Sequence, residues 1–244
     1  MQRAFDCAMH DICLQNLPAV FCLDRAGLSP NDGATHHGLF DISFLRPLPR
    51  AVIMQPKDED ELVDMLWTSL QSGKPCFMRY PRGKGEGVKI KETPAELEIG
   101  KAEVLREPDG DICIWALGNM VNEAMKAAVA IETETGKRVG VVNARFVKPL
   151  DTELLLRHAD ANRTIITMED HCVSGGFGSA VAEELIKYGK KCDIEIVGWP
   201  DEFIPHGTDV ASIREAFNLS TAQIIERVRR RLTPQRSLLR ELFK

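Results

Sequence analysis

The 244-residue sequence predicts an α/β protein built on mostly parallel sheets. Short apolar and β-branched runs alternate with longer runs that carry apolar residues at helical spacing, which is typical of parallel α/β folds. A stretch rich in Gly, Lys and Glu, residues 84–99, separates two such series and has the composition of a linker between domains. We therefore predict four parts: a first domain at 1–83, this linker, a second domain at 100–232, and a tail at 233–244.

The first series begins on a helix and offers only three strands. We expect these strands in "AVFCLD", "AVIMQP" and "CFMRYP", and helices in "MQRAFDCAMHDICLQ", "HGLFDISFLR" and "DEDELVDMLWTSLQ". Three strands make a small parallel sheet with an exposed edge. We therefore expect the first domain to be truncated and to leave apolar surface uncovered.

The second series is complete enough to form an open sheet by itself. Its strands are expected in "DICIWAL", "VGVVNARF", "TIITME" and "IEIVGW". Its helices are expected in "NMVNEAMKAAVAIETET", "DTELLLRHAD", "FGSAVAEELIKYG", "ASIREAF" and "TAQIIERVRRRL".

Composition excludes several classes of function. The net charge of −5 gives no general basic field for nucleic acid, and "RVRRR" at 227–231 fits the solvated face of a helix. No apolar run has the length of a membrane span, and the first residues lack the layout of a signal peptide. The seven cysteines contain no Cys-x-x-Cys pair and mostly lie in apolar runs, which indicates buried, reduced thiols. We expect a cytoplasmic protein without nucleic-acid or membrane partners.

A polar loop follows the first predicted strand. Arg25 comes directly after this strand, and "NDGATHHG" at 31–38 follows a few residues later. Ligands bind beyond the carboxyl ends of strands in open α/β sheets, so Asp32 and His36 could face a cleft. From residue types alone, the stretch is either a polar surface loop or an active-site loop. His37 by itself fits an exposed or structural histidine.

A second polar stretch, "RYPRG" at 79–83, directly follows another predicted strand. Arginine is suited to bidentate capture of phosphate or carboxylate groups. In isolation, a surface ion pair would explain these arginines. Arg25 and Arg82, however, follow two strands that would end at the same edge of the sheet, and this favours a shared anion site.

The glycine-rich stretch "MEDHCVSGGFGSAV" at 168–181 joins a predicted strand to a predicted helix. A phosphate could bind such a helix N-terminus, but the dinucleotide-binding fingerprint fails because Val181 replaces its last glycine. Glu169 and Asp170 would also repel a phosphate. We interpret the stretch as close packing of the helix against the sheet or against another subunit.

Taken together, these residues resemble a known family, the 1-deoxy-D-xylulose-5-phosphate synthases, which are transketolase-like enzymes that depend on thiamine diphosphate. The resemblance extends to about Leu232. Five stretches carry it: "QRAFDCAMHDICLQNLPAVFCLDRAGLSPNDGATHHGLFDISFLRPLP", "MRYPRG", "ARFVKPLD", "TMEDHCVSGGFGSAV" and "GWPDEFIPHGT". It implies the C-terminal part of a pyrimidine-binding α/β domain at 1–83, followed by a complete transketolase C-terminal domain at 100–232.

The resemblance implies a role for five residues. Arg25 and Arg82 match the pair that anchors the phosphate of the acceptor substrate. Asp32 and His36 match the catalytic polar pair that faces the reacting carbonyl and hydroxyl groups, where His36 would shuttle a proton or stabilise an alkoxide. Arg3 matches an arginine near the cofactor and the substrate.

Two positions depart from this pattern or carry no role in it. The sequence reads "GLSPNDG" where the family usually has "GLVGADG", so Pro30 stiffens the loop, and the family pattern does not give its path. His206, in "FIPHG", matches a motif position, but we assign it no catalytic role.

The resemblance also implies a reaction and its cofactors. The family joins pyruvate, after decarboxylation, to glyceraldehyde 3-phosphate, and the product feeds isoprenoid, thiamine and pyridoxal synthesis. Its cofactors are thiamine diphosphate and Mg²⁺. The family's "GDG" motif, which holds the metal and diphosphate, does not occur in these 244 residues, and neither does its pyrimidine-activating Glu.

We therefore expect a C-terminal section of such an enzyme that forms a homodimer. As an isolated chain it should be inactive and should hold no cofactor stably. Two alternatives stay open. The chain could be the natural second subunit of a split transketolase or of an enzyme of the 2-oxo acid dehydrogenase type, or it could be a non-catalytic dimerisation module.

Overall fold

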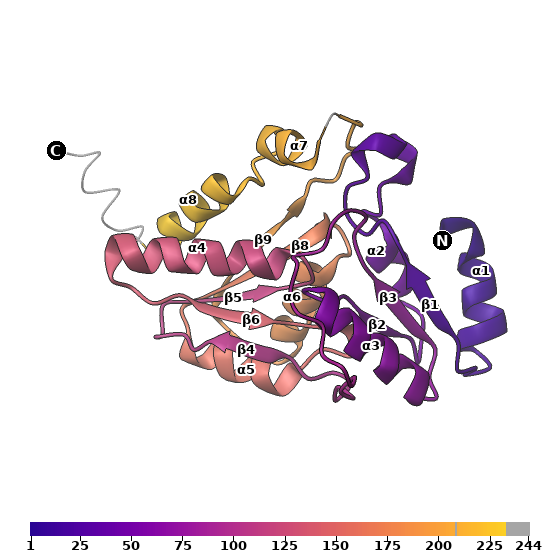
Figure 1. Cartoon of the computed structure of the whole chain (residues 1–244). Helices are drawn as coiled ribbons and strands as arrows, with labels where there is room; N and C mark the ends of the chain where they lie inside the picture. The colour runs from indigo at the N-terminus through magenta and orange to yellow at the C-terminus, as the bar shows by residue number, and fades with distance from the viewer. Residues whose placement is uncertain (208, 233–244) are drawn as a thin grey trace.

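The computed structural model of the chain describes residues 1–207 and 209–232 and shows an α/β fold with two sheets (Figure 1). The predicted tail at 233–244 lies outside the described residues. The α/β class and the mostly parallel strand pairing agree with the prediction.

The first sheet has four strands in the order β1-β3-β2-β7. Its parallel strands are the three expected ones, β1 (Val20–Leu23), β2 (Val52–Met54) and β3 (Cys76–Arg79). The fourth, β7 (Phe146–Lys148), comes from the second half of the chain and pairs antiparallel with β2. The expected single strand "VGVVNARF" is wrong in this respect, because Arg145 adopts a left-handed backbone (φ 58°) and divides the run between two sheets.

Strand β1 lies at the edge of the first sheet, as the sequence predicted. The helical segment before it consists of a 3₁₀ turn, an α-helical turn and a π-helical turn, namely η1 (Gln2–Ala4), α1 (Phe5–Cys7) and η2 (Ala8–Cys13). Apolar surface remains uncovered there, as expected, at the exposed side chains of Met9, Leu14 and Leu17.

Two helices follow in this half, α2 (Asp41–Leu45) and α3 (Glu59–Gln71). Helix α3 begins after Asp58, whose carboxylate accepts the N–H of Glu61 at 2.8 Å and caps the helix. The linker packs along this helix and is hydrogen-bonded to it. Its backbone N–H groups donate to α3 side chains at 2.7 and 2.8 Å, in the pairs Ala95 with Asp64 and Leu97 with Thr68.

The second sheet has the strand order β4-β6-β5-β8-β9. Four strands were expected, and they are β5 (Ile112–Ala116), β6 (Gly140–Asn143), β8 (Thr164–Cys172) and β9 (Asp193–Trp199). The prediction missed β4 (Glu103–Arg106), which pairs antiparallel with β6 at the edge. Its residues "EVLR" alternate in polarity over too short a run to stand out from the linker before it.

Helices cover both faces of the second sheet (Figure 1). One face carries α4 (Met120–Thr135) and α8 (Thr221–Leu232), and the other carries α5 (Thr152–Ala161) and α6 (Phe177–Lys187). The short α7 (Val210–Ala216) precedes α8. Strand β5 supplies both layers of core because its side chains alternate in direction. Ile112, Ile114 and Ala116 join the cluster under α4, whereas Cys113 and Trp115 join the cluster under α5 and α6.

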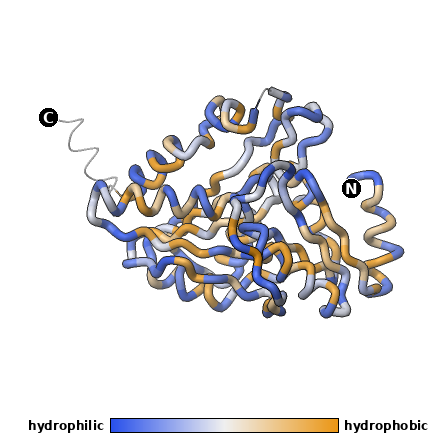
Figure 2. Tube along the Cα trace, viewed as in Figure 1, coloured by the Kyte–Doolittle hydropathy of each residue, from blue (hydrophilic) through white to orange (hydrophobic). Residues whose placement is uncertain are grey.

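The hydropathy of the chain follows this layering (Figure 2): the central strands are mostly hydrophobic, and hydrophilic residues concentrate in the loops. The arginines near the end of α8 form surface ion pairs, such as Arg229 with Glu134 and Arg231 with Glu195, both at 2.5 Å. All seven cysteines are free, although Cys7 and Cys22 are exposed rather than buried. Within the described residues, no helix is both long enough and apolar enough to cross a membrane.

Candidate active site

The carboxyl ends of β1 and β3 are held together beyond the strands themselves. The carbonyl of Leu23 accepts the N–H of Tyr80 at 3.0 Å, and the carbonyl of Tyr80 accepts the N–H of Ala26 at 2.9 Å. This backbone pairing brings Arg25 and Arg82 out at the same edge of the sheet, as the sequence predicted.

The loop between Gly27 and Gly38 closes on itself. The two glycines exchange backbone hydrogen bonds at 3.0 and 2.8 Å. A Cβ on Gly38 would collide with the carbonyl of Arg25, and a Cβ on Gly27 (φ 80°) would collide with Asp170 of the second half. Only glycine therefore permits this close approach at both positions. Inside the loop, the N–H of Ser29 donates to Nδ1 of the buried His37 at 3.0 Å, so His37 is structural.

Asp32 joins the two arginines. It lies on the 3₁₀ turn η3 (Pro30–Asp32), and its Oδ2 accepts the Nε–H of Arg25 at 2.9 Å and also pairs with Nη1 of Arg82. Arg25 pairs with the exposed Asp24 as well. Hydrogen bonds from Arg82, and then from Arg25, lower the pKa of Asp32 to about 2. At neutral pH this carboxylate is ionised, so it can accept hydrogen bonds but cannot donate a proton.

His36 ends the next 3₁₀ turn, η4 (Ala34–His36), and is exposed. Its Nδ1 lies 3.1 Å from Oγ1 of Thr35, which leaves Nε2 available. His36 and Arg25 line a common cavity of about 380 Å³, whose wall also includes Met1, Gln2, Phe40 and Phe44. A reactant in this cavity would have a guanidinium and an imidazole beside it.

Some of the predicted site residues contact one another directly, whereas others share only a cavity or lie near it. Arg25, Asp32 and Arg82 are in direct contact, and Arg25 shares the cavity with His36. Asp32 and Arg82 are not among the residues that line this cavity. Arg3 is exposed on η1, one residue from the cavity wall, and does not line it either.

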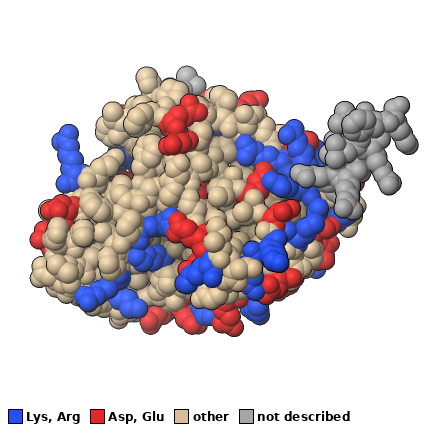
Figure 3. All heavy atoms as spheres, turned by 180° about the vertical axis from the view of Figure 1, so that it is seen from behind, with Lys and Arg blue, Asp and Glu red and all other residues tan. Residues whose placement is uncertain are grey.

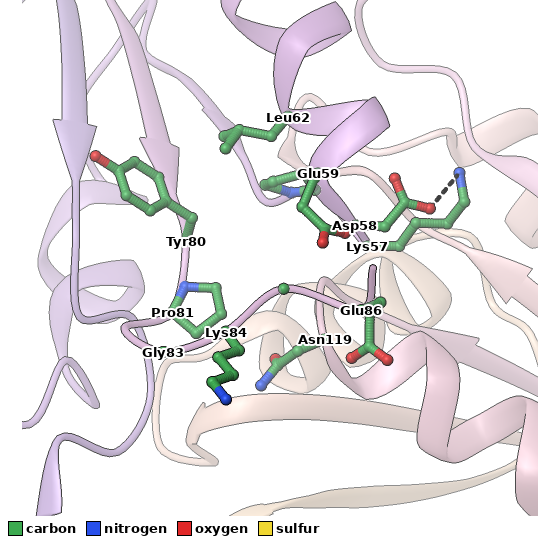
Figure 4. Close-up of a pocket in the computed structure, with 12 residues that line it drawn as sticks. Lys57, Asp58, Glu59, Leu62, Tyr80, Pro81, Gly83, Lys84, Glu86 and Asn119 are labelled. Atoms are coloured by element: carbon green, nitrogen blue, oxygen red, sulfur yellow. Dashed lines mark ion pairs between the residues drawn. The ribbon is translucent and has the colours of Figure 1, made fainter. Parts of the chain in front are cut away.

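A second cavity, of about 290 Å³, lies behind the "RYPRG" stretch (Figure 4). It is bounded by the start of α3, by Tyr80 and Pro81, and by the first residues of the linker. The loop of the linker folds over Glu59, whose Oε1 accepts the N–H of Gly87 at 2.7 Å. None of the site residues expected from the sequence lines this cavity.

The first arginine of "RYPRG" has a structural role that the sequence did not reveal. Arg79 is fully buried, and its Nε donates to Asp41 at 2.9 Å. Its Nη2 donates to the carbonyl of Gly38 at 2.9 Å, and its Nη1 bonds to Gln55. Arg79 thereby fixes the end of the candidate loop. Strand alternation could have given the signal, because residues 79 and 82 need not face the same way.

Asp170, in the second half of the chain, lies directly against the loop at Gly27. Its carboxylate accepts hydrogen bonds from Trp199 at 2.7 Å, Asn119 at 2.8 Å and Arg214 at 3.0 Å. Burial raises the pKa of Asp170, but the charge of Arg214 and the other two donors outweigh it and lower the pKa overall. Gly27 packs directly on this ionised carboxylate.

Glu169 occupies the N-terminus of α6. Its two carboxylate oxygens accept the N–H groups of Phe177 at 2.6 Å and of Gly178 at 2.7 Å. These are the donors that a phosphate would use at a helix N-terminus. A Cβ on Gly178 would also collide with Ile196 and Thr167 of the sheet. The interpretation of this stretch as close helix–sheet packing is therefore confirmed.

The resemblance implies that Mg²⁺ accompanies the cofactor, so the chain can be searched for side chains that would bind it. Across residues 1–207 and 209–232, no group of three or more His, Cys, Asp or Glu side chains is arranged to hold a metal ion. We therefore assign no ligand of the cofactor's metal to this chain.

The fold and this site define a class of protein. The chain belongs to the transketolase family: residues 1–86 match the family described as "Transketolase, pyrimidine binding domain", and residues 100–224 match "Transketolase, C-terminal domain". Within that family, it is similar to a C-terminal section of the 1-deoxy-D-xylulose-5-phosphate synthases. It is 50% identical over 233 residues to the synthase of Acidobacterium capsulatum and 49% identical over 232 residues to that of Heliobacterium modesticaldum.

These relatives are much longer than the chain. The alignments cover 96% and 95% of this chain but only 37% and 35% of the two synthases. A solved structure named "Split gene transketolase, inactive beta4 tetramer" superposes with a TM-score of 0.80 at 31% identity, over 94% of this chain and 71% of that one. Transketolase from Campylobacter jejuni, at 20% identity and a TM-score of 0.62 over 86% of this chain and 30% of that one, shares the fold.

Proposed function

We propose that this chain supplies the acceptor-binding part of an enzyme that makes 1-deoxy-D-xylulose 5-phosphate from pyruvate and glyceraldehyde 3-phosphate, with release of CO₂. The observation that carries the proposal is the contact of Arg25 and Arg82 through Asp32, at a sheet edge beside a cavity that His36 also lines. The similarity to named synthases supports the choice of reaction. The product would feed isoprenoid, thiamine and pyridoxal synthesis.

Arg25 and Arg82 would bind the phosphate of the acceptor. Each guanidinium carries five N–H donors, and Asp32 engages only some of them. Asp24 takes a further donor of Arg25. The remaining N–H groups can reach a phosphate while Asp32 holds both side chains in place. A pre-ordered pair loses less conformational entropy when the substrate binds.

His36 and Asp32 would act on the reacting groups. Imidazole can give and take a proton near neutral pH, so His36 can protonate the oxygen of the acceptor carbonyl as the new carbon–carbon bond forms. Asp32 remains ionised and would accept a hydrogen bond from a substrate hydroxyl. Its second role is to position the two arginines.

Thiamine diphosphate, when bound, would supply the carbanion chemistry of this reaction. Arg3 would lie near the cofactor, since its neighbours Met1 and Gln2 line the cavity that contains His36. We assign no residue of this chain to the diphosphate or its Mg²⁺, because the described residues offer no cluster of metal ligands. We propose that the isolated chain is inactive and holds no cofactor stably, because the family's "GDG" motif and its pyrimidine-activating Glu do not occur in the 244 residues.

The division of the chain and its assembly are also proposals. We propose a pyrimidine-binding part at 1–83, a linker at 84–99, a C-terminal domain at 100–232 and a tail at 233–244, with the chain acting as a homodimer. Seven free cysteines fit the reducing cytoplasm. A second candidate arrangement is the subunit of a split enzyme, which the structural similarity to a split-gene transketolase favours.

The test is an assay of the purified 244-residue chain with pyruvate, glyceraldehyde 3-phosphate, thiamine diphosphate and magnesium. We expect no turnover from the chain alone. We expect turnover when the N-terminal part of a related synthase is added as a domain that carries both the diphosphate-binding motif and the pyrimidine-activating Glu. Activity of the chain alone would contradict the first expectation.

The experiment with the added domain distinguishes the synthase from the alternative functions. Turnover with the added domain on the synthase substrates supports the proposal. Turnover only with ketose and aldose phosphates would indicate a split transketolase, and turnover only with a 2-oxo acid and a lipoyl acceptor would indicate the dehydrogenase type. If the added domain binds but no reaction occurs with any of these substrates, the chain is a non-catalytic module.

A further inference from the structure

A cavity of about 400 Å³ lies at the end of the first sheet that is opposite to the candidate active site. Its wall consists of residues that precede or begin the parallel strands, or that end or follow β7: Asn16, Arg50, Ala51, Val52, Lys74, Lys148 and Pro149. Because β1, β2 and β3 are parallel, their amino ends meet here and their carboxyl ends meet near Arg25 and Arg82. The two sites are thus separated by the length of the strands.

The charged side chains of this cavity are all basic. Arg50, Lys74 and Lys148 line it, and no Asp or Glu does. Among the described residues, none of the three forms an ion pair with a carboxylate, and the ammonium of Lys74 has no hydrogen-bond partner. On the face drawn in Figure 3, basic and acidic side chains are largely interspersed. The cavity therefore carries a local excess of three positive charges in a chain of net charge −5, with Arg50 and Lys74 exposed and Lys148 half-buried. Such a local excess attracts anions.

Two of these cations are held in place by the backbone. The Nζ of Lys148 donates to the carbonyls of Arg46 and Leu48, both at 2.7 Å. Arg50 adopts a left-handed backbone (φ 67°), and its Nη1 donates to the carbonyl of Leu14 at 3.0 Å. Left-handed backbone is uncommon for arginine and often marks functional sites. Each of these two side chains keeps further N–H donors that these bonds do not use.

Lys148 is half-buried, and no carboxylate of the described residues pairs with its ammonium group. Burial lowers the pKa of this ammonium, and no carboxylate offsets the effect. A bound anion would stabilise the ammonium form of Lys148 and accept a hydrogen bond from its remaining N–H. The same site therefore has a physical reason to select an anion over a neutral molecule.

We propose that this cavity is a second anion-binding site, which takes a small organic phosphate. A phosphate group provides oxygens for several cationic donors at once, which suits a wall with one guanidinium and two ammonium groups. The volume exceeds what a phosphate group alone requires and lies in the range of small-ligand pockets. Ala51, Val52 and Pro149 give the organic part of the ligand an apolar wall.

Calorimetric titration of the 244-residue chain with glycerol 3-phosphate tests this proposal, with glycerol as the uncharged comparison. The starting protein carries Arg25→Ala and Arg82→Ala, so that the candidate active site cannot account for the binding. We expect saturable binding of glycerol 3-phosphate and none of glycerol. Absence of saturable binding in this background would overturn the proposal.

Three further variants of that background locate the bound phosphate. Lys74→Gln removes a cation that has no structural contact, so the fold should be kept, and we expect Kd to rise by about tenfold or more. Arg50→Gln should have a similar effect. Lys89→Gln removes one positive charge from the exposed linker and should leave Kd within about twofold. An unchanged Kd for Lys74→Gln, or an equal loss for Lys89→Gln, would overturn the proposal.

Discussion

The Nε–H of Arg25, which precedes the closed loop between Gly27 and Gly38, donates to Oδ2 of Asp32 inside that loop at 2.9 Å. The same oxygen pairs with Arg82, so one carboxylate orders two arginines from different strand ends. Asp32 thus acts as the counter-ion of both arginines and holds them in position before an anion binds. This arrangement explains how a chain with few basic clusters can present two arginines together.

The first prediction concerns the titration of Asp32. Because Arg82 and Arg25 hold its pKa at about 2, the carboxylate should stay ionised throughout the range in which the protein is folded. A lowered pKa means that the contribution of this group to stability is present above the ordinary pKa of about 3.9 and is lost as pH falls toward 2. Carbon-13 NMR of the side-chain carboxyl measures this midpoint. Arg82→Ala should raise the midpoint, and a parent value at or above 3.9 would contradict the account.

The second prediction concerns His36. In the complete enzyme, His36→Ala should lower kcat by about 10²- to 10⁴-fold, because a positioned general acid–base group contributes about that much. His10→Ala is the matched control, since His10 is an exposed histidine that is remote in sequence from the loop. It should leave kcat unchanged. A near-normal kcat for His36→Ala would reduce His36 to an ordinary loop residue.

The third prediction concerns Arg79, which holds the end of the loop, and its effect on the free energy of unfolding. Arg79→Ala should lower the free energy of unfolding by about 3–5 kcal/mol, because it leaves the carboxylate of Asp41 without its buried partner. Arg138→Ala, at an exposed position, should change it by less than about 0.5 kcal/mol. Urea denaturation measures both values. Equal small effects would mean that the buried pair is not needed for stability.

The fourth prediction concerns the pH dependence of stability. Burial raises the pKa of Glu169 to about 8, against the opposing N–H groups of Gly178 and Phe177. The folded state then binds this proton more tightly than the unfolded state, whose pKa is about 4.3. The contribution of Glu169 is therefore fully present below pH 4.3 and is lost as pH rises toward 8.

Urea denaturation at a series of pH values between 5 and 9 checks this sign. Glu169→Gln should flatten the decline in the free energy of unfolding over this range, even if its overall stability is lower. Glu92→Gln, at an exposed linker position, should keep the slope of the parent. A parent protein whose stability rises steadily with pH would show that Glu169 is ionised in the fold.

Much of the fold follows from local pattern. Helix α3 was predictable because acidic residues open it and apolar residues recur at helical spacing. Strand β7 was not, because the division at Arg145 depends on which sheet offers a free edge, and that is a long-range property. Strand β4 is short and gains its pairing from β6, far along the chain.

The candidate site divides in the same way. Arg25 and Arg82 could be placed at one sheet edge because the ends of parallel strands coincide. The bridge through Asp32 could not be predicted, since it depends on how the loop closes between Gly27 and Gly38. The burial of Arg79 could not be predicted either, because the sequence does not reveal that Asp41 is buried beside it and pairs with it.

The central claim is that Arg25 and Arg82 bind the phosphate of the acceptor. Steady-state kinetics of the complete enzyme with Arg25→Ala and with Arg82→Ala measures it most directly, with Arg138→Ala as the control. Loss of one charge-assisted phosphate contact should cost about 1.5–3 kcal/mol, which corresponds to an acceptor KM raised about 10- to 160-fold, with the KM for pyruvate unchanged. An unchanged acceptor KM in both variants would contradict the claim.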